Sequence, residues 1–209
     1  MPQHHLPADI ERTSLKMIAA ELAELGLTPP PETEAVVRRV IHTTADFDYA
    51  KNLRFTPGAV QKAVEALHKG AFLVTDTNMA LAGITKPGLA KLGGQAACYM
   101  ADPEVAARAK AEGTTRAVAA MHKAAAEHPG AILAVGNAPT ALLTIAEQIE
   151  AGLRPALVIG VPVGFVNVVE SKERIIQAAA APYIVSRGRK GGSNVAAAIC
   201  NAMLYQIRR

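Results

Sequence analysis

The stretch "AILAVGNAPT", residues 131–140, decides the fold class, because it places a continuous apolar run directly before a polar turn. An apolar run of this length without alternation is typical of a strand buried on both faces of a parallel sheet. Pro139 suits the first turn of a following helix. The segment therefore predicts a buried strand that leads into a helix over 139–151.

The same pattern recurs along most of the chain. Further apolar runs of this kind are "AFLVT" at 71–75, "AACYM" at 96–100, "ALVIGV" at 156–161 and "YIVS" at 183–186. Helical periodicity between and around them predicts helices at 57–69, 103–110, 114–127, 171–180 and 192–207, preceded by two more at 9–25 and 32–42. Strands alternating with helices predict an α/β fold with an open parallel sheet and crossover helices. We expect one domain over residues 1–209, with N-terminal helices at about 9–42 and the alternating part at about 53–209.

The composition limits the kinds of protein that this chain can be. Its 209 residues suffice for one domain with a real core, and only 4% of them are aromatic, so small and aliphatic side chains must fill that core. The net charge of +4 is scattered, which argues against a nucleic-acid groove and suits an anionic small molecule. Cys98 and Cys200 lie in apolar surroundings, which indicates a reducing compartment. The sequence shows neither a signal region nor a membrane span, so we expect a cytoplasmic protein without membrane contact.

Every chemically unusual segment directly follows a predicted strand. These segments are "DTNMALAGITKPG" at 76–88, "GNAPT" at 136–140, "VPVGFVNVVESK" at 161–172 and "RGRKGGSN" at 187–194. In open α/β sheets, ligands bind outside the carboxyl ends of the strands. We therefore expect these segments to share one edge of the sheet and to form a ligand site there.

The segment "RGRKGGSN" carries the densest positive charge. It sets Arg187, Arg189 and Lys190 in a glycine-rich turn before a helix that Ser193 could cap. Cations at a helix N-terminus are mildly unfavourable unless an anion lies among them, so the pattern favours an anion site over a solvated turn. The spacing matches neither a Walker loop nor a GxGxxG fingerprint, so a nucleotide is not the first expectation.

Arg116 repeats this placement in "GTTRAVAAM". If Thr114 or Thr115 is the N-cap, Arg116 falls in the first helical turn, where an acidic residue is usual. A solvent-facing Arg explains the observation equally well. Two such placements in one chain nevertheless favour a ligand that carries several carboxylates or phosphates.

Other polar residues near the strand ends have simpler explanations when they are taken alone. Asn137 belongs to a well-made strand-to-helix turn, and Thr85 with Lys86 lies beside a rigid turn. Ser14 borders the apolar stripe of the first helix, where a serine usually faces water. None of them would indicate a site without further support.

His42 lies in "RRVIHTTADFDY", at the end of the second predicted helix. It follows Arg38 by four residues and Arg39 by three, so one helix face can present arginine and histidine together. A helix C-terminus favours the protonated imidazole, which would make His42 a competent acid, although a mere helix-end residue is an equal alternative. A metal site with Asp46 and Asp48 is less favoured, because no other His or Cys has ligand spacing. We therefore expect no metal site.

Seven segments, in order, resemble the precorrin-8X methylmutase family, which includes the cobalt-precorrin-8 methylmutases of vitamin B12 biosynthesis. They are "ERTSLKMI", "RVIHTTADFDY", "DTNMALAGI", "GTTRAVAA", "GNAPTAL", "GVPVGFVNVVESKE" and "GRKGGSNVAAA". The resemblance runs from about residue 10 to the C-terminus. Each motif is weak alone, whereas all of them in sequence are very specific.

The resemblance implies a flavodoxin-like three-layer fold with a five-stranded parallel sheet, and a homodimer whose active sites use both subunits. It implies an isomerase that moves a methyl group from C-11 to C-12 of a corrin-precursor tetrapyrrole. The product would be hydrogenobyrinic acid, or cobyrinic acid when the ring holds cobalt. The reaction would need no nicotinamide, flavin or methyl donor.

The resemblance also assigns roles to particular residues. The catalytic His of the family falls on His42, which would donate a proton to a ring nitrogen, and we expect Asp46 or Asp48 to orient it. The carboxylate arms of the ring suit a basic rim, because arginine forks match carboxylates. Substrate contacts are expected from Ser14, Arg39, Thr85, Arg116, Asn137, Arg187, Arg189, Lys190 and Ser193.

Some details separate this chain from other members and from other functions. It has "NVVESK" where the family has "GAAESK", so Asn167 adds bulk to a loop near the ring, while "HTTADFDY" and "DTNMALAGI" favour the cobalt substrate. A non-catalytic carrier of corrinoids or polyanions is the main alternative. A hydrolase or phosphotransferase is not supported, because the chain has no GxSxG elbow and no phosphate loop.

Overall fold

The structure is a computed structural model of the chain and describes residues 6–178 and 180–207. Within them, one sheet has the strands β1 (Leu53–Phe55), β2 (Leu73–Thr75), β3 (Ala96–Ala97), β4 (Ile132–Val135), β5 (Leu157–Gly160) and β6 (Tyr183–Ser186). The longer helices are α1 (Pro7–Glu24), α2 (Pro31–Thr44), α4 (Ala59–His68), α7 (Pro103–Ala111), α8 (Arg116–Glu127), α9 (Pro139–Glu150), α10 (Val168–Ala178) and α11 (Ser193–Gln206). Short turns of helix are α3 (Tyr49–Asn52), α5 (Asn78–Gly83), α6 (Lys86–Ala90) and the 3-10 helix η1 (Tyr99–Ala101).

The sheet is mixed and six-stranded, in the order β1-β6-β5-β4-β2-β3. Neighbouring strands from β3 to β6 pair in parallel, whereas β1 pairs antiparallel with β6, with Leu53 opposite Ser186. The expectation of a five-stranded parallel sheet was therefore wrong at this edge. The three residues of β1 form no apolar run, so only their pairing with the distant β6 makes them a strand.

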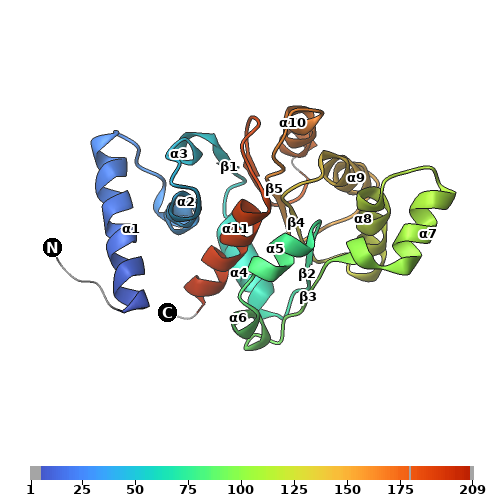
Figure 1. Cartoon of the computed structure of the whole chain (residues 1–209), viewed down its shortest axis with the longest axis horizontal. Coiled ribbons are helices and arrows are strands. Elements are labelled where there is room, and N and C mark those ends of the chain that lie inside the picture. The colour runs from blue at the N-terminus through green and yellow to red at the C-terminus, as the bar shows by residue number, and fades with distance from the viewer. Residues whose placement is uncertain (1–5, 179, 208–209) are drawn as a thin grey trace.

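Helices cover both faces of the sheet, so the fold has three layers: helices, sheet and helices. Side chains alternate along β4, so that Ile132 and Ala134 join one buried cluster while Leu133 and Val135 join the other. Figure 1 shows α2, α4, α5 and α11 on one side of the strands and α7, α8, α9 and α10 on the other, with α1 outside α2. This alternation explains why the central strands read as continuous apolar runs.

The segment after β2 differs most from expectation, because a region read as a loop contains α5 and α6. Thr77 caps α5, since its Oγ1 accepts from the N–H of Ala80 at 3.1 Å. The strand expected at 96–100 ends after two residues and turns into η1. Cys98 and Cys200 are unpaired, and no helix in the described ranges is long and apolar enough to cross a bilayer.

The turn between β6 and α11 packs against the end of β5 through its glycines. The N–H of Gly192 donates to Val161 O at 2.9 Å, and a Cβ at Gly191 would lie 2.1 Å from the same oxygen. Only a glycine fits at position 191, because the obstructing atom belongs to the main chain.

Replacing Gly191 by alanine is therefore expected to lower the free energy of unfolding by about 1–3 kcal/mol, as overpacked sites do. Gly130→Ala is the matched control, because a Cβ there meets nothing within 4 Å and the φ of Gly130 is not positive. Urea unfolding of the two variants measures the difference. Equal midpoints would contradict the close packing of the turn.

Candidate functional site

His42 and Ser14 meet where α1 packs on α2. His42 lies half-buried in the last turn of α2, and its Nδ1 is 2.8 Å from Ser14 Oγ on α1. One turn earlier on α2, Arg39 forms an ion pair with Glu11 of α1 and stacks over the ring of Tyr205, 4.8 Å from its centroid. The structure thus brings together three expected site residues, Ser14, Arg39 and His42.

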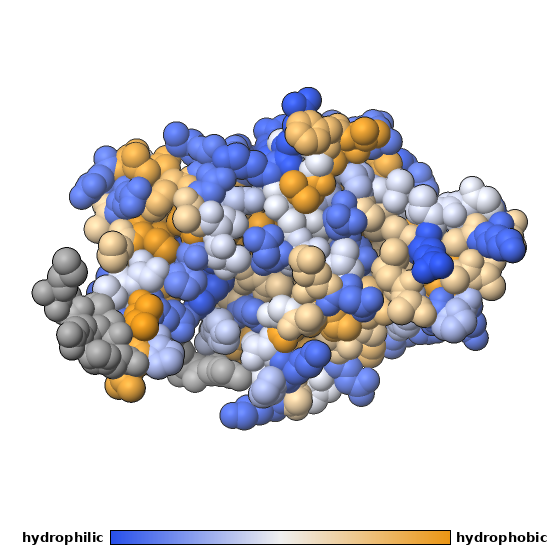
Figure 2. Space-filling view, viewed as in Figure 1, coloured by the Kyte–Doolittle hydropathy of each residue, from blue (hydrophilic) through white to orange (hydrophobic). Residues whose placement is uncertain are grey.

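A hollow of about 390 Å³ opens beside this pair, between α1 and α2. Ser14 and His42 line it, and most of its other walls are apolar: Ile10, Met17, Ile18, Ile41, Ala45 and Phe47. Ile10 is 51% exposed and Met17 66%, and Figure 2 shows apolar surface on the part of the molecule where α1 lies. An apolar hollow with one imidazole suits a flat apolar ligand that receives or gives a proton.

Asp46 and Asp48 do not orient His42, contrary to expectation. Both carboxylates accept hydrogen bonds from Lys190 Nζ, each at 2.7 Å. The hydrogen bond from Lys190 holds the pKa of Asp48 below its usual value. Ser14 is instead the polar partner of the imidazole, and Lys190 ties the turn before α11 to the chain that follows α2.

The remaining cations of the expected basic rim are in two different states. Arg187 is engaged by Glu173 through two hydrogen bonds of 2.7 Å, which raise the pKa of Arg187. Arg116 and Arg189 are exposed and form no ion pair with any residue that the structure describes; Arg189 lies over the ring of Phe165, 5.3 Å from its centroid. Arg116 and Arg189 are therefore the cations that can bind an added carboxylate without breaking an existing ion pair.

Asp76, which the sequence reading did not single out, organises the ends of β2 and β4. Its buried carboxylate accepts from the N–H groups of Gly136 at 2.8 Å, Asn137 at 2.8 Å and Ala138 at 2.7 Å. Burial raises the pKa of Asp76, while these three donors oppose the rise. The signal in the sequence was an acidic residue placed directly after a buried apolar run.

Ser193 does not cap α11, contrary to expectation. Gly192 occupies the N-cap position, and Ser193 Oγ lies 2.8 Å from Thr77 Oγ1, at the end of β2. The chains approach so closely here that a Cβ on Gly136 would lie 2.7 Å from Ser193 Cα. Asn137 is exposed beside this contact, so Asn137 and Ser193 do share one edge of the sheet.

Thr85 is positioned by a residue that the sequence reading also missed. Asn201 of α11 accepts from the N–H of Thr85 at 2.9 Å and donates to Gly83 O at 2.8 Å. Asn201 thereby fixes the connection between α5 and α6. Its sequence signal was an amide inside the otherwise apolar stretch "AAAICNAML".

The expected site residues form two groups in a single chain. Ser14, Arg39 and His42 lie at α1 and α2, whereas Arg116 begins α8 after its N-cap Thr115. Figure 1 shows α2 and α8 on opposite sides of the molecule. One chain therefore does not place Arg116 beside His42.

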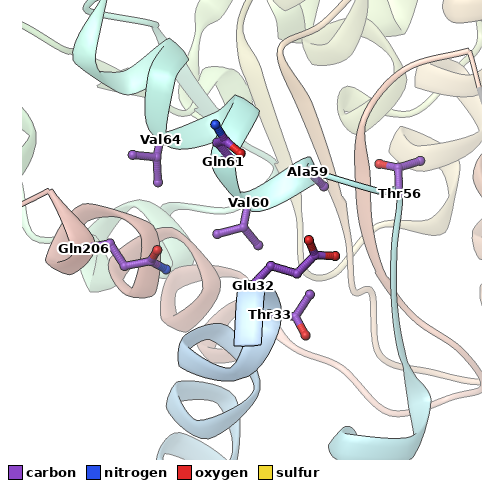
Figure 3. Close-up of a pocket in the computed structure, with 9 residues that line it drawn as sticks. Glu32, Thr33, Thr56, Ala59, Val60, Gln61, Val64 and Gln206 are labelled. Carbon is purple, nitrogen blue, oxygen red and sulfur yellow. The ribbon is translucent and has the colours of Figure 1, made fainter. Parts of the chain in front are cut away.

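A second hollow, of about 290 Å³, lies between the first turn of α2, α4 and the end of α11 (Figure 3). Glu32, Thr56, Val60 and Gln206 are among its lining residues, and Glu32 is the only charged one among the described residues that line it. Both hollows contain a glutamate, Glu21 in the first and Glu32 in the second, but only the first also has a histidine in its described lining. Among residues 6–178 and 180–207, no cluster of three His, Cys, Asp or Glu side chains could hold a metal ion.

Comparison with known proteins shows where this geometry belongs. The family model described as precorrin-8X methylmutase matches residues 9–206. The chain belongs to the precorrin-8X methylmutase family. It is thus a methylmutase, an isomerase of vitamin B12 biosynthesis, as the resemblance in its motifs implied.

Relatives of this methylmutase match along nearly their whole length. The cobalt-precorrin-8 methylmutase of Salmonella typhimurium is 44% identical, with 97% of this chain and 96% of the relative covered. The precorrin-8X methylmutase of Pseudomonas aeruginosa is 38% identical, with 93% of each covered. The crystal structure of the precorrin-8X methylmutase from Thermus thermophilus superimposes with a TM-score of 0.86 at 41% identity, covering 95% of this chain and 97% of that one.

The departure of this methylmutase from the family motif has a conformational explanation. Asn167 has a φ of 57°, in the left-handed region that glycine adopts freely. Asparagine tolerates this conformation better than most other residues do. Asn167 can therefore adopt this turn although it carries a side chain.

Proposed function

We propose that this methylmutase converts cobalt-precorrin-8 or precorrin-8X by moving a methyl group from C-11 to C-12 of the ring, giving cobyrinic acid or hydrogenobyrinic acid. The reaction is an isomerisation, so no atom is gained or lost. The observation that carries the proposal is the contact between Ser14 and His42 beside an apolar hollow, in a chain of this family. The cobalt substrate is favoured, because three relatives of 40–44% identity are named cobalt-precorrin-8 methylmutases, whereas the Thermus thermophilus protein of 41% identity is named for precorrin-8X. They include proteins from Priestia megaterium and Leptospira interrogans.

In this proposal His42 is the proton donor. Its Nδ1 is held by Ser14 Oγ, which leaves Nε2 for the ligand in the hollow. A protonated imidazole would donate from Nδ1 to Ser14 and from Nε2 to a ring nitrogen, and this protonation would promote the migration. The remaining catalysis would come from holding the ring in place.

Arg116 and Arg189 are proposed as the main partners of the carboxylate arms, because both are exposed and free of ion pairs with the described part of the chain. Arg39, Arg187 and Lys190 already contact carboxylates of the protein, so they would bind substrate only by exchanging those partners. Asn137 and Ser193 are proposed as polar contacts along the strand-end edge, and Thr85, which lies beside Asn201 further along α11, is proposed as a polar contact away from that edge.

A homodimer is part of the proposal, because a single chain offers an incomplete site. The hollow of 390 Å³ is at the small end of ligand pockets, which span about 300–1,000 Å³, and a tetrapyrrole with several arms is larger than a drug-sized molecule. His42 belongs to α2 and Arg116 begins α8, and these two helices lie on opposite sides of the molecule in Figure 1. We propose that a second copy brings its Arg116 to this His42.

Mixing two inactive variants tests the shared site. His42→Ala and Arg116→Ala are each expected to be inactive as homodimers, whereas heterodimers obtained by co-expression would contain one intact site. Partial recovery of activity in the mixture supports the shared site. No recovery, with heterodimers present by mass, would show that each chain builds its site alone.

The finer fold assignment is likewise a proposal. Without β1, the parallel strands follow the order second, first, third, fourth, fifth, which is the order of flavodoxin-like sheets. In such sheets the ligand crevice lies where the strand order reverses, which here is between β2 and β4, at Asp76 and Asn137. A cytoplasmic location stays a prediction from the two unpaired cysteines.

The proposed activity is tested by a visible spectrum. Purified protein is mixed with cobalt-precorrin-8 or with precorrin-8X, without any added cofactor, and the absorption is followed in time. Methyl migration rearranges the chromophore, so turnover should change the spectrum, and the faster substrate identifies the preferred ring. A ring that binds but never changes would instead support the carrier function.

Ser14→Ala is expected to lower kcat by about 10–100-fold, the effect typical of residues that orient a reactive imidazole. The alanine removes the partner of Nδ1 and leaves the ring of His42 free to turn. Thr43→Ala is the matched control, because Thr43 is exposed near His42 and donates only to Arg39 O within its own helix. Equal kcat values for the two variants would contradict the orienting role of Ser14.

A further inference from the structure

Lys172 is buried where a charged side chain is unfavourable. It shares the inward face of α10 with Val168, Ser171 and Ile175, and its relative exposure is 0%. Loss of hydration makes such a position costly for an ammonium group, and burial lowers the pKa of Lys172 to about 8. An apolar side chain of similar length would fill the same space without this cost, so the amine needs an explanation.

Both hydrogen bonds that the amine of Lys172 donates within the described residues go to main-chain oxygens of one turn. Its Nζ donates to Gly188 O at 2.7 Å and to Lys190 O at 2.9 Å. The carbonyl of Lys190 also accepts from Ser186 Oγ at 3.1 Å. Lys172 forms no ion pair with a carboxylate among the residues described, so its partners are main-chain oxygens of the segment between β6 and α11.

This segment, residues 187–192, is the basic turn defined by "RGRKGG". With two of its carbonyls turned toward Lys172, the side chains of Arg187, Arg189 and Lys190 are exposed. Through Lys190 the basic turn also reaches Asp46 and Asp48, which follow His42 in the chain. The buried amine of Lys172 thus holds the main chain of the basic turn from inside the protein, while the charged side chains of the turn are exposed.

We propose that Lys172 is a positioning residue for substrate binding, which holds the basic turn in the shape that presents Arg189 to a carboxylate arm of the ring. The inference rests on the proposed function and deepens it. Lys172 touches no substrate in this arrangement and acts only through the turn. A lysine with a purely structural role would affect the stability of the fold and leave the affinity for the ring unchanged.

The test compares Lys172→Met with Lys110→Met in the full chain. Methionine keeps the length of the side chain and removes both donors, and Lys110 is an exposed residue of α7 far from the turn. We expect Lys172→Met to raise the Kd of the ring, measured by its visible absorption, and its KM about tenfold or more, with kcat within threefold of wild type. Lys110→Met should leave both unchanged.

A double-mutant cycle decides whether the effect passes through the turn. Arg189→Ala alone should raise Kd, and combining it with Lys172→Met should raise Kd by less than the product of the single effects. If Lys172→Met does not fold, Lys172→Gln, which keeps a donor amide, takes its place and should show a smaller increase. A folded variant with wild-type Kd, or fully multiplicative effects, would overturn the proposal.

The outcomes separate this inference from the proposed activity. If wild type binds the ring without converting it, the proposed methylmutase activity is contradicted. The Kd values of the variants still test the positioning role of Lys172. If wild type converts the ring and Lys172→Met binds it equally well, only the role of Lys172 fails.

Discussion

Replacing His42 by alanine is expected to lower kcat for methyl migration by about 10²–10⁴-fold, the usual contribution of a positioned general acid. The hollow and the basic residues remain, so the variant should still bind the ring. The physical reason is that His42 supplies the imidazole in the described lining of the hollow, and its contact with Ser14 orients that imidazole for proton transfer. Glu21, the other ionisable residue of that lining, is a carboxylate and cannot replace a cationic donor.

Visible absorption followed over time with either ring measures the loss of kcat. Titration of the ring with the protein, followed by the same absorption, measures Kd. His68→Ala is the matched control, because His68 is an exposed residue in the last turn of α4. A His42→Ala enzyme that turns over within threefold of wild type would refute the proton-donor role. The residue would then be only the end of a helix.

Asp76→Ala is expected to lower the free energy of unfolding by about 3–5 kcal/mol, because three main-chain donors, of which that of Gly136 is buried, lose their acceptor together. The N–H groups of Gly136, Asn137 and Ala138 all point at this carboxylate, and the side chain is 1% exposed. Urea unfolding measures the loss. The turn that carries Asn137 should also lose its shape, so the affinity for the ring should fall as well.

Asp76→Asn separates the hydrogen bonds from the charge. The amide keeps one acceptor oxygen and places an NH₂ against main-chain donors, so an intermediate loss of stability is expected. Asp9→Asn is the control, because Asp9 pairs with Arg12 at the surface and such pairs contribute at most about 1 kcal/mol. If Asp76→Ala unfolds at the midpoint of the control, water must satisfy the three donors and our account is wrong.

Local patterns in the sequence were enough to predict most of the architecture. The apolar runs at 131–136 and 156–161 contain β4 and β5, Thr115 caps the helix that precedes β4, and Pro139 begins the helix that follows it. These features depend on neighbours in the chain, through periodicity and capping. β1 was missed because only its pairing with the distant β6 makes it a strand, whereas α5 has a local cap, Thr77, that the sequence reading overlooked.

The candidate site was predictable only in part. The motifs pointed to His42 and Ser14, but the contact between them joins residues 28 apart. The pairing of Lys190 with Asp46 joins residues 144 apart, so Asp46 contacts Lys190 in place of His42, and Lys190 would have to exchange this partner to bind a substrate. No local pattern encodes which carboxylate a flexible lysine will reach.

What the sequence determined by itself was the α/β class and the family, because each is carried by residues close together or by motifs in fixed order, and the same motifs made His42 the candidate proton donor. Only the tertiary structure decided which cations of the expected rim pair with carboxylates in the described part of the chain, namely Arg39, Arg187 and Lys190, and which do not, namely Arg116 and Arg189. It also placed Asp76 and Lys172 inside, facing main-chain partners from other segments. The physical reason is that burial and ion pairing depend on how separate helices and strands pack. The distance in space between two residues of different elements does not follow from their separation along the chain.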